Sequence, residues 1–146
     1  MKKNKCIIID VDGTLANIDH RRGYLEEGND WKRFNSSMEN DSLNTWCKAI
    51  VDKFKNEYQI ILLTGREEIH KDVTLKWLKG HDVHFDSIFF RSEKDYRDDA
   101  IVKKELFERH IQGKHSPLFV VDDRKKVVSM WRDLGLVCLQ CDWGDF

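Results

Sequence analysis

The sequence predicts a three-layer α/β fold of the Rossmann-like type, with a parallel sheet covered by helices and a small insert after the first strand. Three observations support this prediction. Short apolar runs alternate along the chain with segments of helical periodicity. The apolar runs are typical of buried parallel strands. A single long, polar and irregular stretch, residues 17–44, interrupts the alternation directly after the first strand.

The elements can be justified in chain order. Five apolar runs are expected to be strands, the last of them at an edge of the sheet: residues 6–10, 58–63, 87–90, 118–121 and 137–140. Apolar residues at helical spacing predict helices between them, over residues 46–54, 73–78, 101–111 and 127–134. Gly135 follows the last helical pattern and is expected to end that helix, since glycine is favoured just past a helix C-terminus.

Chain length and charge limit the function classes. The 146 residues fit one domain, so we expect a single domain over residues 1–146 with residues 17–44 as a small cap or lid. Loops of that length in a compact domain are usually functional. Lys and Arg number 25 against 26 Asp and Glu. An anionic partner would therefore be met by a local patch and not by a global positive charge.

No targeting or membrane signal is evident. No apolar run approaches the roughly 18 residues of a membrane span, and the start Met1–Asn4 leads into a strand instead of a signal peptide. We therefore expect a soluble, cytoplasmic protein with no membrane partner.

The four cysteines suggest packing more than chemistry. Cys6 and Cys47 lie in apolar patterns. Cys138 and Cys141 form a CxxC that could be half a zinc site or a redox pair, but no second pair completes a zinc set and a redox CxxC normally opens a helix. We expect packed, reduced thiols. The six histidines show no consistent ligand spacing.

Polar residues follow four of the expected strands where each strand ends: Asp10-Val11-Asp12, Thr64-Gly65-Arg66, Arg91 and Asp122-Asp123-Arg124. Because the carboxyl ends of parallel strands meet at one edge of a sheet, these side chains are expected to converge. Two aspartates there repel each other unless a cation or a shared proton lies between them. The pattern suits metal-assisted phosphoryl transfer.

This set, in this order, resembles the haloacid-dehalogenase superfamily of phosphotransferases, whose Asp-x-Asp-Gly-Thr motif stands at residues 10–14. Within it, the chain is most similar to the 3′-phosphatase domain of phage polynucleotide kinase–phosphatases. The similar segments are residues 64–66, 91–103, 121–124, 131–132 and 144–146. No GxxxxGK[ST] loop is present, so no kinase part is expected in these residues.

The resemblance implies catalytic roles for the acidic residues. Asp10 would be the nucleophile that forms an aspartyl-phosphate, and Asp12 would protonate the leaving oxygen and then deprotonate the hydrolytic water. Mg²⁺ would bind the side chains of Asp10 and Asp123 and the backbone carbonyl of Asp12. Asp122 would be a further ligand through water or would orient the others; we favour Asp123 as the direct ligand.

The resemblance also implies roles in substrate binding. Thr64 would hydrogen-bond a phosphoryl oxygen, and Lys103 would neutralise the charge that develops there. Asp99 lies four residues before Lys103 and could fix its ammonium group, and Gly65 belongs to the same binding segment as Thr64. Three arginines would hold the substrate phosphate or neighbouring backbone phosphates: Arg21, Arg66 and Arg91.

The expected function is a Mg²⁺-dependent polynucleotide 3′-phosphatase that acts on DNA or RNA ends, with a separate kinase or ligase as a conceivable partner. The short insert is too small to enclose the site as a full cap domain does, which favours the end of a polymer as substrate.

An alternative function is a 5′(3′)-deoxyribonucleotidase that acts on mononucleotides. A third interpretation, from another class, is an inactive module that binds phosphorylated ends for a ligase. Trp31 in the insert could stack on a base or pack within the lid.

Overall fold

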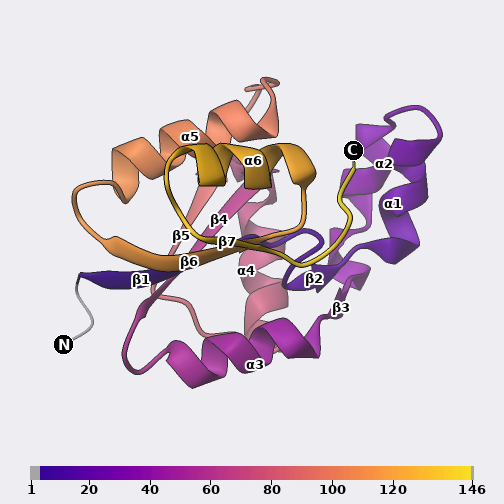
Figure 1. Ribbon diagram of the computed structural model, residues 1–146. Helices are drawn as coiled ribbons and strands as arrows, with labels where there is room; N and C mark the ends of the chain where they lie inside the picture. Colours follow the sequence, from indigo (N-terminus) through magenta and orange to yellow (C-terminus); the bar gives the residue numbers. More distant parts are fainter. Residues whose placement is uncertain (1–3, 146) are drawn as a thin grey trace.

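The computed structural model describes residues 4–145 (Figure 1). Residues 1–3, at the start that leads into the first strand, and Phe146, the last residue of the motif at 144–146, lie outside the described residues.

Five parallel strands form the central sheet in the order β5-β4-β1-β6-β7. Their bounds are β1 Lys5–Ile9, β4 Gln59–Glu67, β5 Ser87–Arg91, β6 Ser116–Asp122 and β7 Cys138–Gln140. The parallel sheet and the edge position of β7 confirm the prediction. One strand boundary differs from the prediction. Strand β4 extends through residues 64–66, so this motif is part of the strand and not of the loop after it.

Helices cover both faces of the sheet (Figure 1). The helices α3 (Thr45–Phe54) and α4 (Lys71–Gly80) pack on one face, and α5 (Asp99–His110) and α6 (Lys125–Asp133) pack on the other. A short 3₁₀ turn, η2 (Glu68–His70), precedes α4. Alternate residues of β1 serve the two layers: Ile7 and Ile9 lie in the first core, Cys6 and Ile8 in the second. The fold is thus three-layered, as expected.

The C-terminal end of α6 matches its prediction. Gly135 has φ +84°, a conformation that glycine adopts without strain, and the Leu136 amide donates to the Trp131 carbonyl. The fully buried indole of Trp131 packs between α6 and the sheet.

The insert is not irregular, and this expectation was wrong. Its elements are β2 (Ala16–Asn17), α1 (Asp19–Glu26), α2 (Trp31–Ser36), a 3₁₀ turn η1 (Met38–Asn40) and β3 (Ser42–Leu43). The strands β2 and β3 pair antiparallel at the base of the insert, and α1 and α2 lie at one end of the sheet (Figure 1). Leu25, Phe34 and Met38 are buried. Each of the two helices buries a single apolar residue, Leu25 in α1 and Phe34 in α2, so no apolar repeat in the sequence reveals them.

Among the described residues, no helix combines the length and apolar character needed to cross a lipid bilayer.

Candidate active site

The structure brings the predicted polar residues to one edge of the sheet. Asp10 directly follows β1, Asp122 ends β6, Arg91 ends β5, and Thr64 lies near the end of β4. These four strands are neighbours in the sheet and run in the same direction, so their carboxyl ends meet.

Asp10 is the centre of the cluster. Its side chain is almost fully buried, and each carboxylate oxygen has a donor: Lys103 Nζ lies 2.8 Å from Oδ1, and Thr14 Oγ1 donates to Oδ2 at 3.0 Å. The tight turn after β1 places Thr14 there, because the amides of Thr14 and Ala16 both donate to the Val11 carbonyl. The carboxylate is therefore held in one orientation by a cation and a hydroxyl.

Three carboxylates meet at this point. One oxygen each from Asp10, Asp122 and Asp123 lies within 4.8 Å of the other two, and all three residues are buried. Asp123 Oδ2 is buried without a hydrogen-bond partner. Gly13, at φ +82°, gives this oxygen room, since a Cβ there would lie 2.1 Å from it. A buried carboxylate oxygen with no donor is costly, and a cation would satisfy it.

The pKa values of Asp10 and Asp123 reflect the close approach of the three carboxylates. Burial, followed by the charge of Asp122, raises the pKa of Asp10 well above its ordinary value, although Lys103 opposes the change. Burial and Asp122 also raise the pKa of Asp123 to about 7. Both shifts reflect carboxylates gathered in a site of low polarity. A divalent cation among them would reverse the effect, so the residues present fit a Mg²⁺ site made of oxygen ligands.

Asp122 differs from Asp123 in how its oxygens are used. Oδ1 accepts from the Asp123 amide at 2.9 Å, and Oδ2 accepts from Lys103 Nζ at 3.0 Å and from the Trp131 indole at 3.3 Å. The carboxylate of Asp122 is thus engaged in shaping the loop and holding Lys103. This favours Asp123 as the direct metal ligand and Asp122 as the residue that orients its neighbours.

Lys103 is fully buried, which is rare for lysine. Burial alone would lower its pKa, but Asp10, Asp122 and Asp99 together raise the pKa well above its ordinary value, so the ammonium stays charged. Asp99, one helical turn earlier, lies 3.7 Å from Nζ. Thr64 is also buried, and its Oγ1 accepts the Arg66 amide at 3.1 Å.

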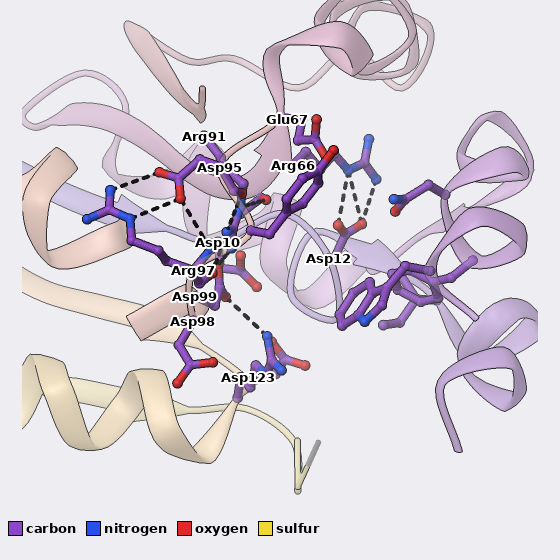
Figure 2. A pocket seen from close by; sticks show the side chains of 17 residues that line it. Asp10, Asp12, Arg66, Glu67, Arg91, Asp95, Arg97, Asp98, Asp99 and Asp123 are labelled. Carbon is purple, nitrogen blue, oxygen red and sulfur yellow. Dashed lines mark hydrogen bonds and ion pairs between the residues drawn. The ribbon is translucent and has the colours of Figure 1, made fainter. Parts of the chain in front are cut away.

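Asp12 is held by two arginines, as Figure 2 shows for Arg66. Arg21 Nη2 and Arg66 Nη2 each donate to Asp12 Oδ1 at 2.6 Å. Burial by itself would raise the pKa of Asp12, but the two guanidinium groups outweigh it and hold the pKa well below its ordinary value. In the structure Asp12 is therefore a carboxylate, and the two arginines bind protein acids where a substrate phosphate is expected to bind them.

Asp41 is a residue of this network that sequence reasoning missed. Its buried carboxylate accepts Arg21 Nε at 2.7 Å and Arg66 Nη2 at 3.3 Å, while His20 Nε2 lies 2.6 Å away. The Trp77 indole donates to its backbone carbonyl. Asp41 lies in a polar stretch that contains other acids, and no spacing distinguishes it; only the fold of the insert brings it to the arginines.

Arg91 differs from its expected role. Its guanidinium donates to the carbonyls of Gly65, Asp95 and Arg97 and to Asp99 Oδ1. With these donors occupied, Arg91 positions the loop after β5 more than it offers a phosphate site. A Cβ on Gly65 would lie 2.1 Å from Asp99 Oδ1, so any larger residue there would displace the Asp99 carboxylate.

A cavity of about 340 Å³ lies over these residues (Figure 2). Its wall includes Asp10, Asp12 and Asp123, and on the outer side Trp31 and Tyr96. Four arginines also line it: Arg66, Arg91, Arg97 and Arg124. Lys103, Thr64, Arg21 and Asp122 are buried beside this wall: Lys103 contacts Asp10, Arg21 contacts Asp12, and Thr64 accepts the Arg66 amide.

The remaining motif residues carry no comparable cluster. Cys6, Cys47 and Cys138 are buried, Cys141 is half-buried, and none is in a disulfide. Burial raises the pKa of Cys141 to about 12. Within residues 4–145, the acidic triad is the one group of histidine, cysteine or acidic side chains close enough together to hold a metal. The CxxC therefore forms no zinc site in this part of the chain.

Comparison with solved structures identifies the class of protein that this fold and site define. A haloacid dehalogenase-like hydrolase from Streptococcus pneumoniae superposes with a TM-score of 0.67 over 97% of this chain and 86% of its own, at 16% sequence identity. A haloacid dehalogenase family enzyme from Bacteroides thetaiotaomicron gives a TM-score of 0.60 over 99% of this chain and 96% of its own, at 14% identity. The chain thus has the fold of haloacid dehalogenase-like hydrolases.

The family is narrower than the fold. Residues 4–146 match the family model of the phosphatase domain of polynucleotide kinase PNKP, and the chain belongs to that family of phosphatases. A chain in the structure of the Pnkp1/Rnl/Hen1 RNA repair complex is 38% identical, with a TM-score of 0.87 over 99% of this chain. A protein of the Autographa californica nuclear polyhedrosis virus, described as a bifunctional polynucleotide kinase/RNA ligase, is 29% identical over 89% of this chain. This chain spans only 44% of the first relative and 18% of the second.

Proposed function

We propose that the chain is a Mg²⁺-dependent phosphatase that removes the 3′-phosphate from DNA or RNA ends. The observation that carries the proposal is the setting of Asp10: a carboxylate fixed by Lys103 and Thr14, beside the unpartnered oxygen of Asp123, in a cavity whose wall carries both arginines and acids. Membership in the PNKP phosphatase family directs this chemistry towards polynucleotide ends.

The reaction would proceed in two displacements. An Asp10 oxygen attacks phosphorus, the bond to the leaving sugar oxygen breaks, and Asp12 gives that oxygen a proton. Water then attacks the aspartyl-phosphate, and Asp12 takes the water proton as inorganic phosphate leaves. Mg²⁺, held by Asp10, Asp123 and the Asp12 backbone carbonyl, would screen the carboxylate from the phosphate and polarise the phosphoryl oxygens. Lys103 and Thr64 would stabilise the charge on those oxygens.

The two arginines on Asp12 give the acid step a physical trigger. Ionised Asp12 cannot donate a proton, and Arg21 and Arg66 keep it ionised. A substrate phosphate in the cavity would compete with Asp12 for Arg66, which lines the cavity, while Arg21 stays bound to Asp41 behind the wall. As Arg66 turns to the phosphate, the pKa of Asp12 rises and the carboxyl can be protonated before the leaving group departs.

The mononucleotidase alternative predicts a pocket closed around one nucleoside. The exposed fractions of Trp31 and Tyr96 at the cavity wall are 44% and 81%, which favours an open mouth and therefore a polymer end. A domain of this family is also suited to act beside a kinase or ligase, as the names of its relatives indicate.

The test compares phosphate release from a 3′-phosphorylated oligonucleotide and from a 3′-mononucleotide, with Mg²⁺ and with EDTA. We expect a higher kcat/KM for the oligonucleotide, and no turnover in EDTA. Preference for the mononucleotide would support the nucleotidase, and turnover of neither would leave the binding module as the better account.

A further inference from the structure

Two aromatic side chains at the cavity mouth have no role in the phosphoryl chemistry. Trp31 opens α2 in the insert, and Tyr96 lies in the loop between β5 and α5. Both line the cavity while keeping 44% and 81% of their surface exposed. Aromatic side chains in the lining of a pocket are typical ligand contacts.

Hydrogen bonds hold the backbone on both sides of Tyr96. Arg91 Nη1 donates to the carbonyls of Asp95 and Arg97, the two residues that flank Tyr96, at 2.9 and 2.5 Å. Arg97 in turn pairs with Asp95 and Glu105 (Figure 2 shows the first pair). Arg91, the last residue of β5, thus holds the backbone on both sides of Tyr96, while the Tyr96 ring itself is exposed to solvent.

Trp31 contacts Arg124, a residue of the loop between β6 and α6. The guanidinium carbon of Arg124 lies 5.9 Å from the centroid of the Trp31 ring, and Phe34 meets that ring edge-on at 5.5 Å. Arg124 follows Asp123 directly in the sequence. The insert therefore contributes an aromatic ring whose position is coupled to the residue next to the metal site.

The occupant that fits this combination is an unpaired nucleic-acid base. Single-stranded binding sites join cations that follow the backbone to aromatic rings on which bases stack. Here four arginines and seven acids line the same cavity as the two rings, and the Arg124 guanidinium lies over the Trp31 ring. A base paired within a duplex already stacks on its neighbours and cannot offer its faces to both rings without fraying.

We propose that Trp31 and Tyr96 are a base-stacking pair that selects 3′-phosphorylated ends whose terminal bases are unpaired. This inference rests on the proposed function, because it specifies which polynucleotide ends the same site takes. Trp31 and Tyr96 are binding residues in this account and take no part in the chemical steps.

The experiment measures kcat and KM for two single-stranded 3′-phosphorylated oligonucleotides that differ only in whether the two terminal nucleotides carry bases or are abasic. A third substrate is the base-bearing strand in a blunt duplex. We expect kcat/KM of the wild-type protein for the base-bearing single strand to exceed that for both other substrates by at least about 10-fold.

In Trp31→Ala or Tyr96→Ala, KM for the base-bearing strand should rise about 5- to 160-fold, the effect of one stacked base, and KM for the abasic strand should be unaffected. Tyr96→Phe keeps the ring and should restore binding.

Trp46→Ala is the matched control, since Trp46 has a nearly equal exposed fraction, 43%, and lies outside this cavity. Its kinetics should equal those of the wild type. Equal wild-type activity on base-bearing and abasic strands would overturn the inference while leaving the phosphatase proposal intact, as would equal losses on both strands in the two alanine variants. Failure of the wild type to release phosphate from any of the three substrates would overturn both proposals.

Discussion

Arg21 of the insert places Nη2 within 2.6 Å of Asp12 Oδ1 and within 2.7 Å of Asp41 Oδ2. A guanidinium from the insert thereby links the second aspartate of the first motif to an acid at the other end of the same insert. The insert is thus part of the candidate site itself and not only a cover for it.

Arg21→Ala tests this link. The buried Asp41 carboxylate would lose its bidentate partner, which should lower the free energy of unfolding by about 3 kcal/mol. Assayed well below its melting temperature, the variant should also lose phosphatase activity by at least about 100-fold, because Asp12 loses one of the two guanidinium groups that position it. Arg22→Ala is the control: Arg22 lies next in the same helix, pairs with Asp19 and Asp142 at longer distances, and should retain activity. Equal effects of the two substitutions would contradict the role given to Arg21.

Lys103→Met should reduce kcat about 100- to 1,000-fold, as expected for removal of one charge that stabilises the transition state. The exposed neighbour Lys104 supplies the comparison, since Lys104→Met keeps the fold and changes net charge equally. Steady-state kinetics at saturating Mg²⁺ measure both variants. If Lys104→Met lowered kcat as much as Lys103→Met, net charge and not the contact with Asp10 would be the cause.

Gly13→Ala should impair both folding and activity. The left-handed backbone at φ +82° disfavours any Cβ, and the added atom would lie 2.1 Å from Asp123 Oδ2. Gly23 lies inside α1, and a Cβ added there would meet nothing within 4 Å, so Gly23→Ala should raise stability by up to about 1 kcal/mol. Thermal unfolding and phosphatase assays of the pair should give opposite signs. A fully active and stable Gly13→Ala protein would show that the turn and Asp123 are not in contact.

Arg97 gives a prediction for pH. It lowers the pKa of Asp95 to about 2 and also lowers the pKa of Glu105. Because these pKa values are lower in the folded than in the unfolded chain, the carboxylates stabilise the fold fully above about pH 5, and this contribution is lost as pH falls towards 2. The melting temperature of Arg97→Ala should lie up to a few degrees below that of the wild type at pH 7, with the gap closing between pH 5 and pH 2. Lys126→Ala is the control, because Lys126 is exposed and lies elsewhere; its melting temperature should show no pH-dependent difference from the wild type. If the difference between Arg97→Ala and the wild type stayed constant with pH, the ion pairs of Arg97 would not be its cause.

The sheet and the aspartates around Asp10 could be predicted because each signal is local. An apolar run followed by acids fixes both the strand and the place where its polar end must lie, and parallel strands then bring Asp10 and Asp123 to the same edge. The Asp99–Lys103 pair was equally accessible, because one helical turn separates the two residues.

The insert could not be predicted because its packing is long-range. Arg21 is buried by Phe34 and Asp41, which lie far along the chain from it. The residues next to an arginine in the sequence do not reveal whether its side chain is buried or exposed. Likewise, the position of Arg91 at a strand end suggests a phosphate ligand, and only the fold of the loop at residues 92–98 shows that its donors are occupied. Side-chain partners set by tertiary contacts leave no periodic trace in the sequence.

The most direct test of the central claim is to look for the phosphoryl group on Asp10. The protein would be mixed with an oligonucleotide that carries a radioactive 3′-phosphate and Mg²⁺, quenched in acid within one turnover, and digested for peptide mapping. We predict label on the peptide that contains Asp10, and neither label nor phosphate release in Asp10→Asn. Rapid phosphate release with no label on that peptide, or undiminished release by Asp10→Asn, would contradict the account.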